Sequence, residues 1–179
     1  MSELLSVNKD NPAFAEAARK VKFLGIDFDG VMTDNSVFVF EDGREAVRCS
    51  RLEGFGIKRL KAIGVEPMII STEKNPVVSM RAEKLKIDCI QAVEDKVAVV
   101  RELLARRGLE WSQAGFIGND INDAGVLTHV GLPVVVADAH PSIEFVGAFR
   151  TLRVGGDGAV RQVCDEITDL HIRDEKADR

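Results

Sequence analysis

The chain has 179 residues, of which 45% are hydrophobic and 30% charged, and its formal net charge is −5. This composition predicts one soluble globular domain and excludes a disordered or fibrous protein. The negative charge and the lack of a dense Lys/Arg run argue against nucleic acid or an anionic membrane as a partner. Neither a signal-peptide pattern nor an apolar run of membrane-spanning length occurs in the sequence, so we expect a cytoplasmic protein.

The first predicted element is a buried strand over residues 21–28, an apolar run that ends on acidic residues. A second apolar run at 37–40, the turn residues 41–43 and a run at 44–49 predict a β-hairpin over about residues 36–50. Helices and strands then alternate. The predicted helices cover residues 51–62, 76–85, 96–107 and 121–130, and the predicted strands cover 67–70, 88–90, 114–117 and 133–136.

This alternation predicts βαβ crossovers and therefore a Rossmann-like α/β fold, in which helices cover both faces of a parallel sheet in three layers. A last helix is expected from about residue 158 to 170. The predicted organisation is an N-terminal extension (1–20), one domain (21–170) and a mobile charged tail (171–179) whose last residues lack a core anchor.

Polar clusters follow three of the predicted strands, at 27–34, 71–73 and 118–123, and Lys96 opens the helix between the last two. Ligands of open parallel sheets bind beyond the carboxyl ends of the strands, so we expect these clusters to form one site. Asp27 and Asp29 flank a single residue and can share a hard cation, which would offset the repulsion between a carboxylate and a phosphate dianion. Alternatively, the two carboxylates only cap a turn.

These clusters resemble the motifs of haloacid dehalogenase (HAD) phosphatases, in order along the chain. Asp-Phe-Asp-Gly-Val-Met-Thr-Asp at 27–34 resembles the first motif, Ser71 and Lys96 stand at the second and third, and the acidic loop at 118–123 stands at the fourth. The resemblance covers about residues 21–167. It implies a magnesium-dependent phosphomonoesterase with Asp27 as the nucleophile that becomes an aspartyl phosphate.

The same resemblance implies the roles of the remaining site residues. Asp29 would act as general acid and base, Ser71 would bind phosphoryl oxygens, and Lys96 would neutralise charge. The implied metal ligands are Asp27, Asp29 through its backbone carbonyl, and Asn119, with Asp120 and Asp123 in support. Taken alone, Ser71 is more typical of a helix cap and Lys96 is more typical of a solvated surface lysine.

Asn119 departs from the family pattern, which has a metal-binding carboxylate at this position. An amide oxygen binds magnesium more weakly than a carboxylate. The phosphatase-like portions of acylneuraminate cytidylyltransferases include Gly-Asn variants of this motif. A catalytically silent oligomerisation or regulatory module is therefore the alternative to an enzyme. A phosphotransferase or mutase is a third reading, which the lack of a cap disfavours.

The spacing of the motifs leaves no room for a cap domain, so closure of the site must come from elsewhere, most simply from a neighbouring subunit. Four large apolar residues at 37–40 make the hairpin the candidate interface. The alternative is a hairpin strand buried on both sides within one subunit. The cap-less pattern, with the segments 137–141 and 155–161, resembles phosphatases of eight- and nine-carbon 2-keto-3-deoxy sugar acids, which implies a homotetramer and a small phosphorylated sugar acid as substrate.

Substrate contacts are expected from Thr72, Glu73 and Lys84. Within this family the pair of Glu73 and Lys84 is closer to the nine-carbon type than to the eight-carbon type. The alternative for this pair is a glutamate at a helix start and a solvated lysine.

Overall fold

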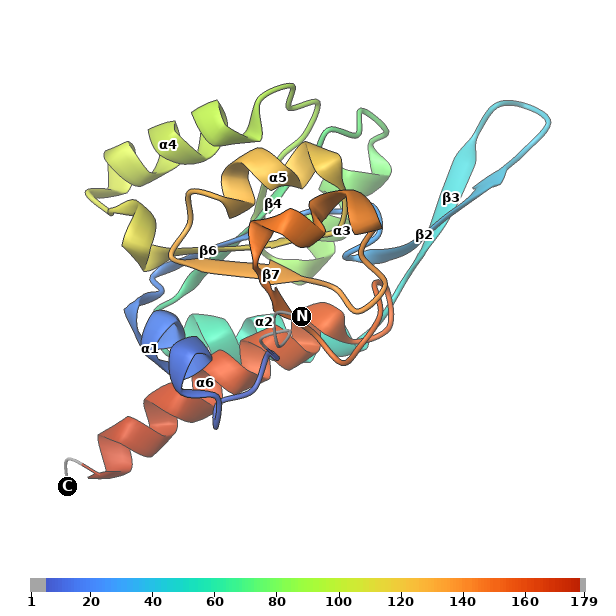
Figure 1. The fold of residues 1–179 in the computed structure, drawn as a ribbon. Coiled ribbons are helices and arrows are strands. Elements are labelled where there is room, and N and C mark those ends of the chain that lie inside the picture. Colours follow the sequence, from blue (N-terminus) through green and yellow to red (C-terminus); the bar gives the residue numbers. More distant parts are fainter. Residues whose placement is uncertain (1–5, 178–179) are drawn as a thin grey trace.

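Residues 6–177 are described by a computed structural model, which contains one parallel sheet and one hairpin (Figure 1). The sheet strands are β1 (Phe23–Ile26), β4 (Glu66–Ile70), β5 (Asp88–Ile90), β6 (Ala114–Gly118), β7 (Leu132–Val135) and β8 (Phe149–Arg150). Their order is β5-β4-β1-β6-β7-β8, and each pair is parallel. The hairpin of β2 (Thr33–Val39) and β3 (Glu45–Cys49) is antiparallel and projects away from the sheet.

Helices cover both faces of this sheet. They are α1 (Pro12–Lys20), α2 (Leu52–Ala62), α3 (Val77–Leu85), α4 (Lys96–Arg107), α5 (Ile121–Leu127) and α6 (Ala159–Ala177). Helices α4 and α5 lie on one face, α1, α2 and α6 lie on the other, and α3 packs beside β5 (Figure 1). The predicted three-layer α/β/α fold is confirmed.

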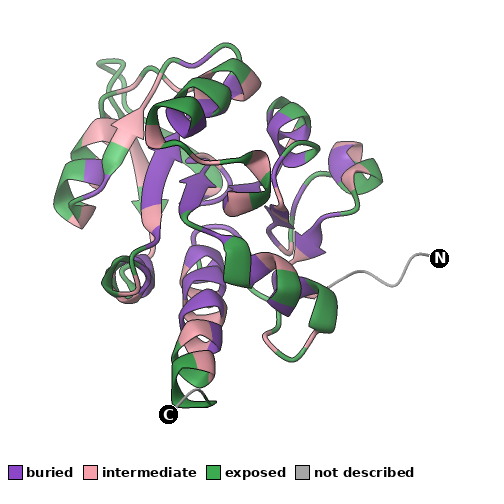
Figure 2. Cartoon of the chain, turned by 90° about the vertical axis from the view of Figure 1, so that its left-hand side faces the viewer, coloured by how far each residue is buried: buried purple, intermediate pink, exposed green. Residues whose placement is uncertain are grey.

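The core lies between these layers, around the central strands. All four residues of β1 and all five of β6 are buried, because helices cover them from both sides. Figure 2 shows the same burial along the inward side of α6, which contributes Val160, Val163 and Ile167 to the core. A continuous apolar run in the sequence therefore corresponds to a strand that is buried on both faces.

The predicted N-terminal extension contains a packed helix. Asn11 caps α1 by accepting hydrogen bonds from the backbone N–H groups of Ala13 and Phe14. Phe14 and Ala18 are fully buried, and the Phe14 ring meets Phe149 edge-on. Residues 12–20 are thus part of the domain core, and residues 1–5 lie outside the described part of the chain.

The segment predicted as a tail from residue 171 is helical over residues 171–177, because α6 continues to Ala177. The charged side chains of this last part pair with the N-terminal segment. Asp174 Oδ2 lies 2.6 Å from Arg19 Nε, and Arg173 Nη1 lies 3.2 Å from Asp10 Oδ1. A highly charged segment can form a helix where a neighbouring element supplies side chains of opposite charge. Residues 178–179 lie outside the described residues.

Smaller differences concern element ends and short elements. Helix α5 ends at Leu127, three residues before the predicted end. The two-residue strand β8 and the 3₁₀ segments Trp111–Gln113 and Pro141–Val146 were not predicted, since such short elements carry no periodicity. Within residues 6–177, none of the helices combines the length and apolarity needed to cross a bilayer.

Helices α2 and α6 approach closely at Gly56, which predicts a stability effect. A Cβ atom at Gly56 would lie 3.0 Å from Arg161 Cα and 3.0 Å from Cys164 Cβ. We expect Gly56→Ala to lower the free energy of unfolding by about 1–3 kcal/mol, because overpacking outweighs the better helix propensity of alanine. Urea unfolding measures this. The control is Gly54→Ala in the same helix, where the nearest atom would be Leu85 Cδ2 at 3.3 Å. Equal stability of the two variants would contradict the close packing.

Candidate active site

The three polar clusters meet at one edge of the sheet, as predicted. Strand β1 lies between β4 and β6, with Ile26 opposite both Ile69 and Ile117. After β1 the chain passes to α2 on one face of the sheet, and after β6 it passes to α5 on the other, so the carboxyl ends of β1 and β6 form a topological switch point. Asp27 follows β1 there, and its backbone N–H donates to Ile117 O at 3.0 Å.

An ammonium group lies between two carboxylates at this point. Lys96 Nζ is 2.7 Å from Asp27 Oδ1 and 2.6 Å from Asp123 Oδ1, and all three side chains are buried. Lys96 is the first residue of α4, so the helix start holds its side chain beside β1. The alternative of a solvated surface lysine is therefore wrong for Lys96.

The cluster has two carboxylates and one ammonium group, and this composition affects the pKa of Asp27. Burial and, after it, the charge of Asp123 raise the pKa of Asp27 to about 7, against the opposing effects of Lys96 and of the Phe28 N–H. Both contacts of the Asp27 carboxylate use Oδ1, which accepts from Phe28 N at 2.8 Å and faces Lys96. Oδ2 has no hydrogen-bond partner among the described residues, so it is available to a cation.

Asp123 and Asp120 organise the loop after β6. Asp123 Oδ2 accepts from Asn119 N at 2.8 Å, while its Oδ1 contacts Lys96. Asp120 caps α5 through Ile121 N and accepts a hydrogen bond from Ser142 Oγ. Asp123 therefore belongs to the charged cluster, and Asp120 shapes the helix start beside it.

Asn119 is buried against the loop that follows β1. Its backbone is fixed from both sides, by Asp123 and by His140 N, which donates to Asn119 O at 2.8 Å. A Cβ atom at Gly30 would lie only 2.1 Å from Asn119 Nδ2, so the approach of the amide requires glycine at position 30. The Asn119 side chain has no hydrogen bond to another described residue.

The donor atoms at this point fit a hard cation. Within residues 6–177 no group of three His, Cys, Asp or Glu side chains is arranged to hold a metal ion. Asp27 Oδ2 and the Asn119 amide have no other partner among the described residues, and the motif resemblance adds the backbone carbonyl of Asp29. Such an all-oxygen set is what Mg²⁺ prefers, and a cation would offset the excess negative charge of the cluster.

Ser71 is buried at the end of β4 and has a local partner. Its Oγ accepts a hydrogen bond from Glu73 N at 3.0 Å, so the capping alternative describes a real contact. A hydroxyl that accepts one bond can still donate its hydrogen to another atom. The contact with Glu73 is therefore compatible with a second role in binding phosphoryl oxygens.

A hollow of about 200 Å³ opens beside Asp29, between the hairpin and the loop after β4. Its lining residues are Asp29, Asn35, Ser36, Val37, Glu45, Val47, Glu73, Asn75 and Val77. Burial and then the charge of Glu73 raise the pKa of Asp29, which favours a carboxyl group that donates a proton. Glu45 and Asn75 were not predicted here. Asn75 Nδ2 donates to Glu45 Oε2 at 3.1 Å, a hairpin-to-loop contact that no sequence pattern signals.

The predicted substrate residues are only partly brought together. Glu73 lines the hollow, but its Oε1 accepts from Lys74 N and Asn75 N, as a helix-start glutamate does. Thr72 is exposed beside Ser71.

Lys84 does not line the hollow beside Asp29 that Glu73 lines. It is seven residues beyond Val77 in α3, roughly 10 Å further along the helix. There it lines a separate hollow between α2 and α3 with Lys58 and Lys61. The expectation that Glu73 and Lys84 both contact substrate came from the linear motif, which does not show that the two residues line different hollows.

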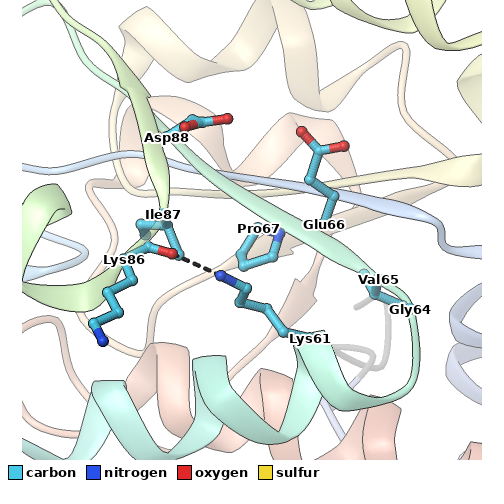
Figure 3. Close-up of a pocket in the computed structure, with 8 residues that line it drawn as sticks. All are labelled: Lys61, Gly64, Val65, Glu66, Pro67, Lys86, Ile87 and Asp88. Atoms are coloured by element: carbon cyan, nitrogen blue, oxygen red, sulfur yellow. Dashed lines mark hydrogen bonds between the residues drawn. The ribbon is translucent and has the colours of Figure 1, made fainter.

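Another hollow, shown in Figure 3, lies at the opposite edge of the sheet, where β4 and β5 begin. Lys61 Nζ donates to Lys86 O at 2.6 Å across it. The carboxylates of Glu66 and Asp88 lie on the side of the strands away from Lys61 (Figure 3). These lysines and carboxylates are far along the strands from Asp27. This hollow is therefore separate from the charged cluster.

Comparisons with known proteins agree with this geometry. No family model matches the chain. A curated 3-deoxy-D-manno-octulosonate 8-phosphate phosphatase (KdsC) from Yersinia pestis is 35% identical over 153 residues, which are 85% of this chain and 82% of the relative. A structure from Legionella pneumophila, described as a putative HAD superfamily (subfamily III A) hydrolase, has a TM-score of 0.87 and 35% identity, covering 91% of this chain and 90% of that one.

A third similar protein is the 3-deoxy-D-manno-octulosonate 8-phosphate phosphatase of Moraxella catarrhalis, solved with magnesium, phosphate and KDO. It has a TM-score of 0.83 and 29% identity, covering 87% of this chain and 90% of that one. Fold and site thus define a phosphoric monoester hydrolase of the HAD superfamily, as the motifs predicted. The chain belongs to the KdsC family of 3-deoxy-D-manno-octulosonate 8-phosphate phosphatases.

The buried position of Lys96 leads to a prediction about stability. Lys96→Met leaves Asp27 and Asp123 without a counter-charge, which should lower the free energy of unfolding by about 3–5 kcal/mol at pH 8. The loss should shrink toward pH 4, because protonated carboxyl groups need no counter-charge. Urea unfolding without metal at both pH values measures it. Lys58→Met, on the exposed surface of α2, is the control and should change stability by less than about 0.5 kcal/mol. An equally small effect of Lys96→Met would contradict the charged cluster.

Proposed function

We propose that the chain is a magnesium-dependent phosphatase that hydrolyses 3-deoxy-D-manno-octulosonate 8-phosphate. The observation that carries this proposal is the buried cluster of Lys96, Asp27 and Asp123 at the carboxyl end of the central strand. Support for the metal and the sugar acid comes from the Moraxella catarrhalis relative, whose structure holds magnesium, phosphate and KDO.

In the proposed reaction, one carboxylate oxygen of Asp27 attacks phosphorus while the other would remain for the metal. The bond from phosphorus to the ester oxygen breaks, and Asp29 donates its proton to the departing alkoxide. The resulting aspartyl phosphate is hydrolysed when Asp29, now a carboxylate, accepts a proton from the attacking water. Phosphate leaves and Asp27 is regenerated.

Other groups make these steps possible. Lys96 neutralises charge on Asp27 and on the transferring group, and Ser71 donates to a phosphoryl oxygen. Magnesium would be held by Asp27, Asn119 and the carbonyl of Asp29, and it would supply positive charge that lets the nucleophile approach an anionic phosphate.

The silent-module alternative accounts poorly for this cluster. Removing two carboxylates and an ammonium group from water costs several kcal/mol per ion, and apolar side chains would fill the same space at no such cost. A module that only assembled subunits would have no use for the arrangement. We therefore treat Asn119 as a weaker metal ligand of an active enzyme.

We favour the eight-carbon substrate over a nine-carbon nonulosonate 9-phosphate. The sequence-based case for nine carbons rested on Glu73 with Lys84, and Lys84 lies away from the site. Glu73 is already engaged with two backbone N–H groups. The related proteins from Yersinia pestis and Moraxella catarrhalis are both named as phosphatases of the eight-carbon compound, 3-deoxy-D-manno-octulosonate 8-phosphate.

The hairpin is proposed to contact neighbouring subunits. Phe38 is 65% exposed and Val39 68% exposed, so the alternative of a strand buried on both sides is wrong for the single chain. An apolar ribbon of this kind is typical of an interface. The homotetramer and the cytoplasmic location stay predictions.

Asp27→Asn tests the proposed function. The variant should fold and lose turnover on a panel of eight- and nine-carbon sugar-acid phosphates at saturating magnesium, because an amide is no nucleophile. Without metal it should also be more stable than the parent, by a margin that grows as the pH rises from 3.8 to about 7. Over this range the parent loses stability, since the folded pKa of Asp27 is raised and ionisation favours the unfolded chain. Retained turnover would remove Asp27 from its role, and preference for a nine-carbon ester would overturn the substrate.

Asn119→Asp tests the metal site. A carboxylate should bind magnesium more tightly than the amide, so the half-saturating magnesium concentration should fall about tenfold or more. The rate at saturating magnesium should change much less, because Asp27, Asp29 and Lys96 are unaltered. Phosphate release across a magnesium titration measures both quantities. An inert parent together with an active Asn119→Asp variant would support the silent module instead.

A further inference from the structure

The glycine-rich turn at residues 155–158, just before α6, packs against the loop that follows β1. A Cβ atom at Gly155 would lie 1.9 Å from Gly30 O, and one at Gly156 would lie 2.5 Å from Thr33 C. Gly156 N also donates to Val31 O at 3.0 Å. The turn therefore supports the backbone of residues 30–34, which continues directly from Asp27 and Asp29.

The two ends of this turn are held by carboxylates from distant parts of the chain. At one end, Asp138 Oδ1 accepts from Gly155 N at 2.9 Å. At the other end, Glu53 Oε1 accepts from Gly158 N at 3.0 Å and Oε2 accepts from Arg161 N at 2.6 Å. Glu53 comes from α2, more than 100 residues earlier in the chain, and it is fully buried.

Capping a helix with a buried carboxylate costs desolvation free energy that a surface cap does not. The first N–H groups of α6 need acceptors, and a local Ser, Thr or Asp usually provides them at the surface. Here the adjacent Asp157 is exposed, whereas the buried Glu53 makes both bonds. Burial raises the pKa of Glu53 to about 7, which reflects the cost of placing this carboxylate in the core.

We infer that Glu53 is a positioning residue for phosphoryl transfer. Glu53 fixes the backbone of Gly158 and Arg161 and so holds the 155–158 turn against residues 30–34. The 155–158 turn then fixes the loop that carries Asp29. Glu53 touches neither substrate nor metal in this role. The inference rests on the proposed phosphatase function, and general principles give its scale: displacement of a catalytic group by about 1 Å can cost up to about 100-fold in rate.

The test compares Glu53→Gln with Gln162→Ala. Gln162 is the matched control, because its Oε1 accepts from Leu152 N and Arg153 N and its Nε2 donates to Val7 O. Its side chain therefore ties down the start of α6 without a hydrogen bond to the 155–158 turn, and the backbone bond from Gln162 N to Gly158 O is unchanged by Gln162→Ala. Both variants are assayed with 3-deoxy-D-manno-octulosonate 8-phosphate and with p-nitrophenyl phosphate at saturating magnesium. Unfolding by urea shows how much stability each has lost.

We expect Glu53→Gln to lower kcat about tenfold for both esters with little change in KM, since it disturbs the reacting groups and not the sugar contacts. Gln162→Ala should keep kcat within about twofold at a similar loss of stability. Equal kcat losses in the two variants, an unchanged kcat in Glu53→Gln, or a change confined to KM would overturn the positioning role.

Amide hydrogen exchange separates this inference from the proposed function. In Glu53→Gln the backbone amides of residues 30–34 should exchange about tenfold faster than in the parent, while in Gln162→Ala they should not change. This readout needs no turnover. If the parent hydrolyses neither ester, the proposed function fails, and the exchange result alone decides whether Glu53 holds the loop. Unchanged exchange in Glu53→Gln would overturn the inference.

Discussion

The contact of Lys96 with Asp27 and Asp123 is the constraint on which the rest of the site depends. Buried ions are tolerated only where partners surround them, and this cluster keeps an excess of negative charge even with its lysine in place. The same excess makes the nucleophile ready for a cation. Burial, and after it this excess charge, explain why the pKa of the Asp27 carboxyl is raised although an ammonium group lies 2.7 Å away.

Rigid elements hold this charge in place. Lys96 stands at the first position of α4, Asp123 in the first turn of α5, and Asp27 directly after the central strand. Backbone hydrogen bonds of the parallel sheet set the register of the strand ends, so all three groups start from fixed points. The loop after β1 is then supported from outside by the 155–158 turn, to which Asp138 and Glu53 bind.

The substrate side of the site is built differently from the phosphoryl side. The hollow beside Asp29 is open and polar, and it lies where the hairpin leaves the sheet. The hairpin itself has a large exposed apolar surface that no described part of the chain covers. An open site beside an uncovered apolar ribbon agrees with closure by another subunit.

The sequence by itself determined the sheet strands β1, β4, β5, β6 and β7, the layer order and the residues of the charged cluster. It did so because buried strands give continuous apolar runs, and because the carboxyl ends of parallel strands must meet at one edge. Only the tertiary structure decided which long-range partners these residues have. Lys84 lines a different hollow, Glu45 and Asn75 line the one beside Asp29, α6 continues to Ala177, and Glu53 holds a turn more than 100 residues away. Such contacts depend on how helices and loops pack against one another, and local periodicity and spacing contain no information about that packing.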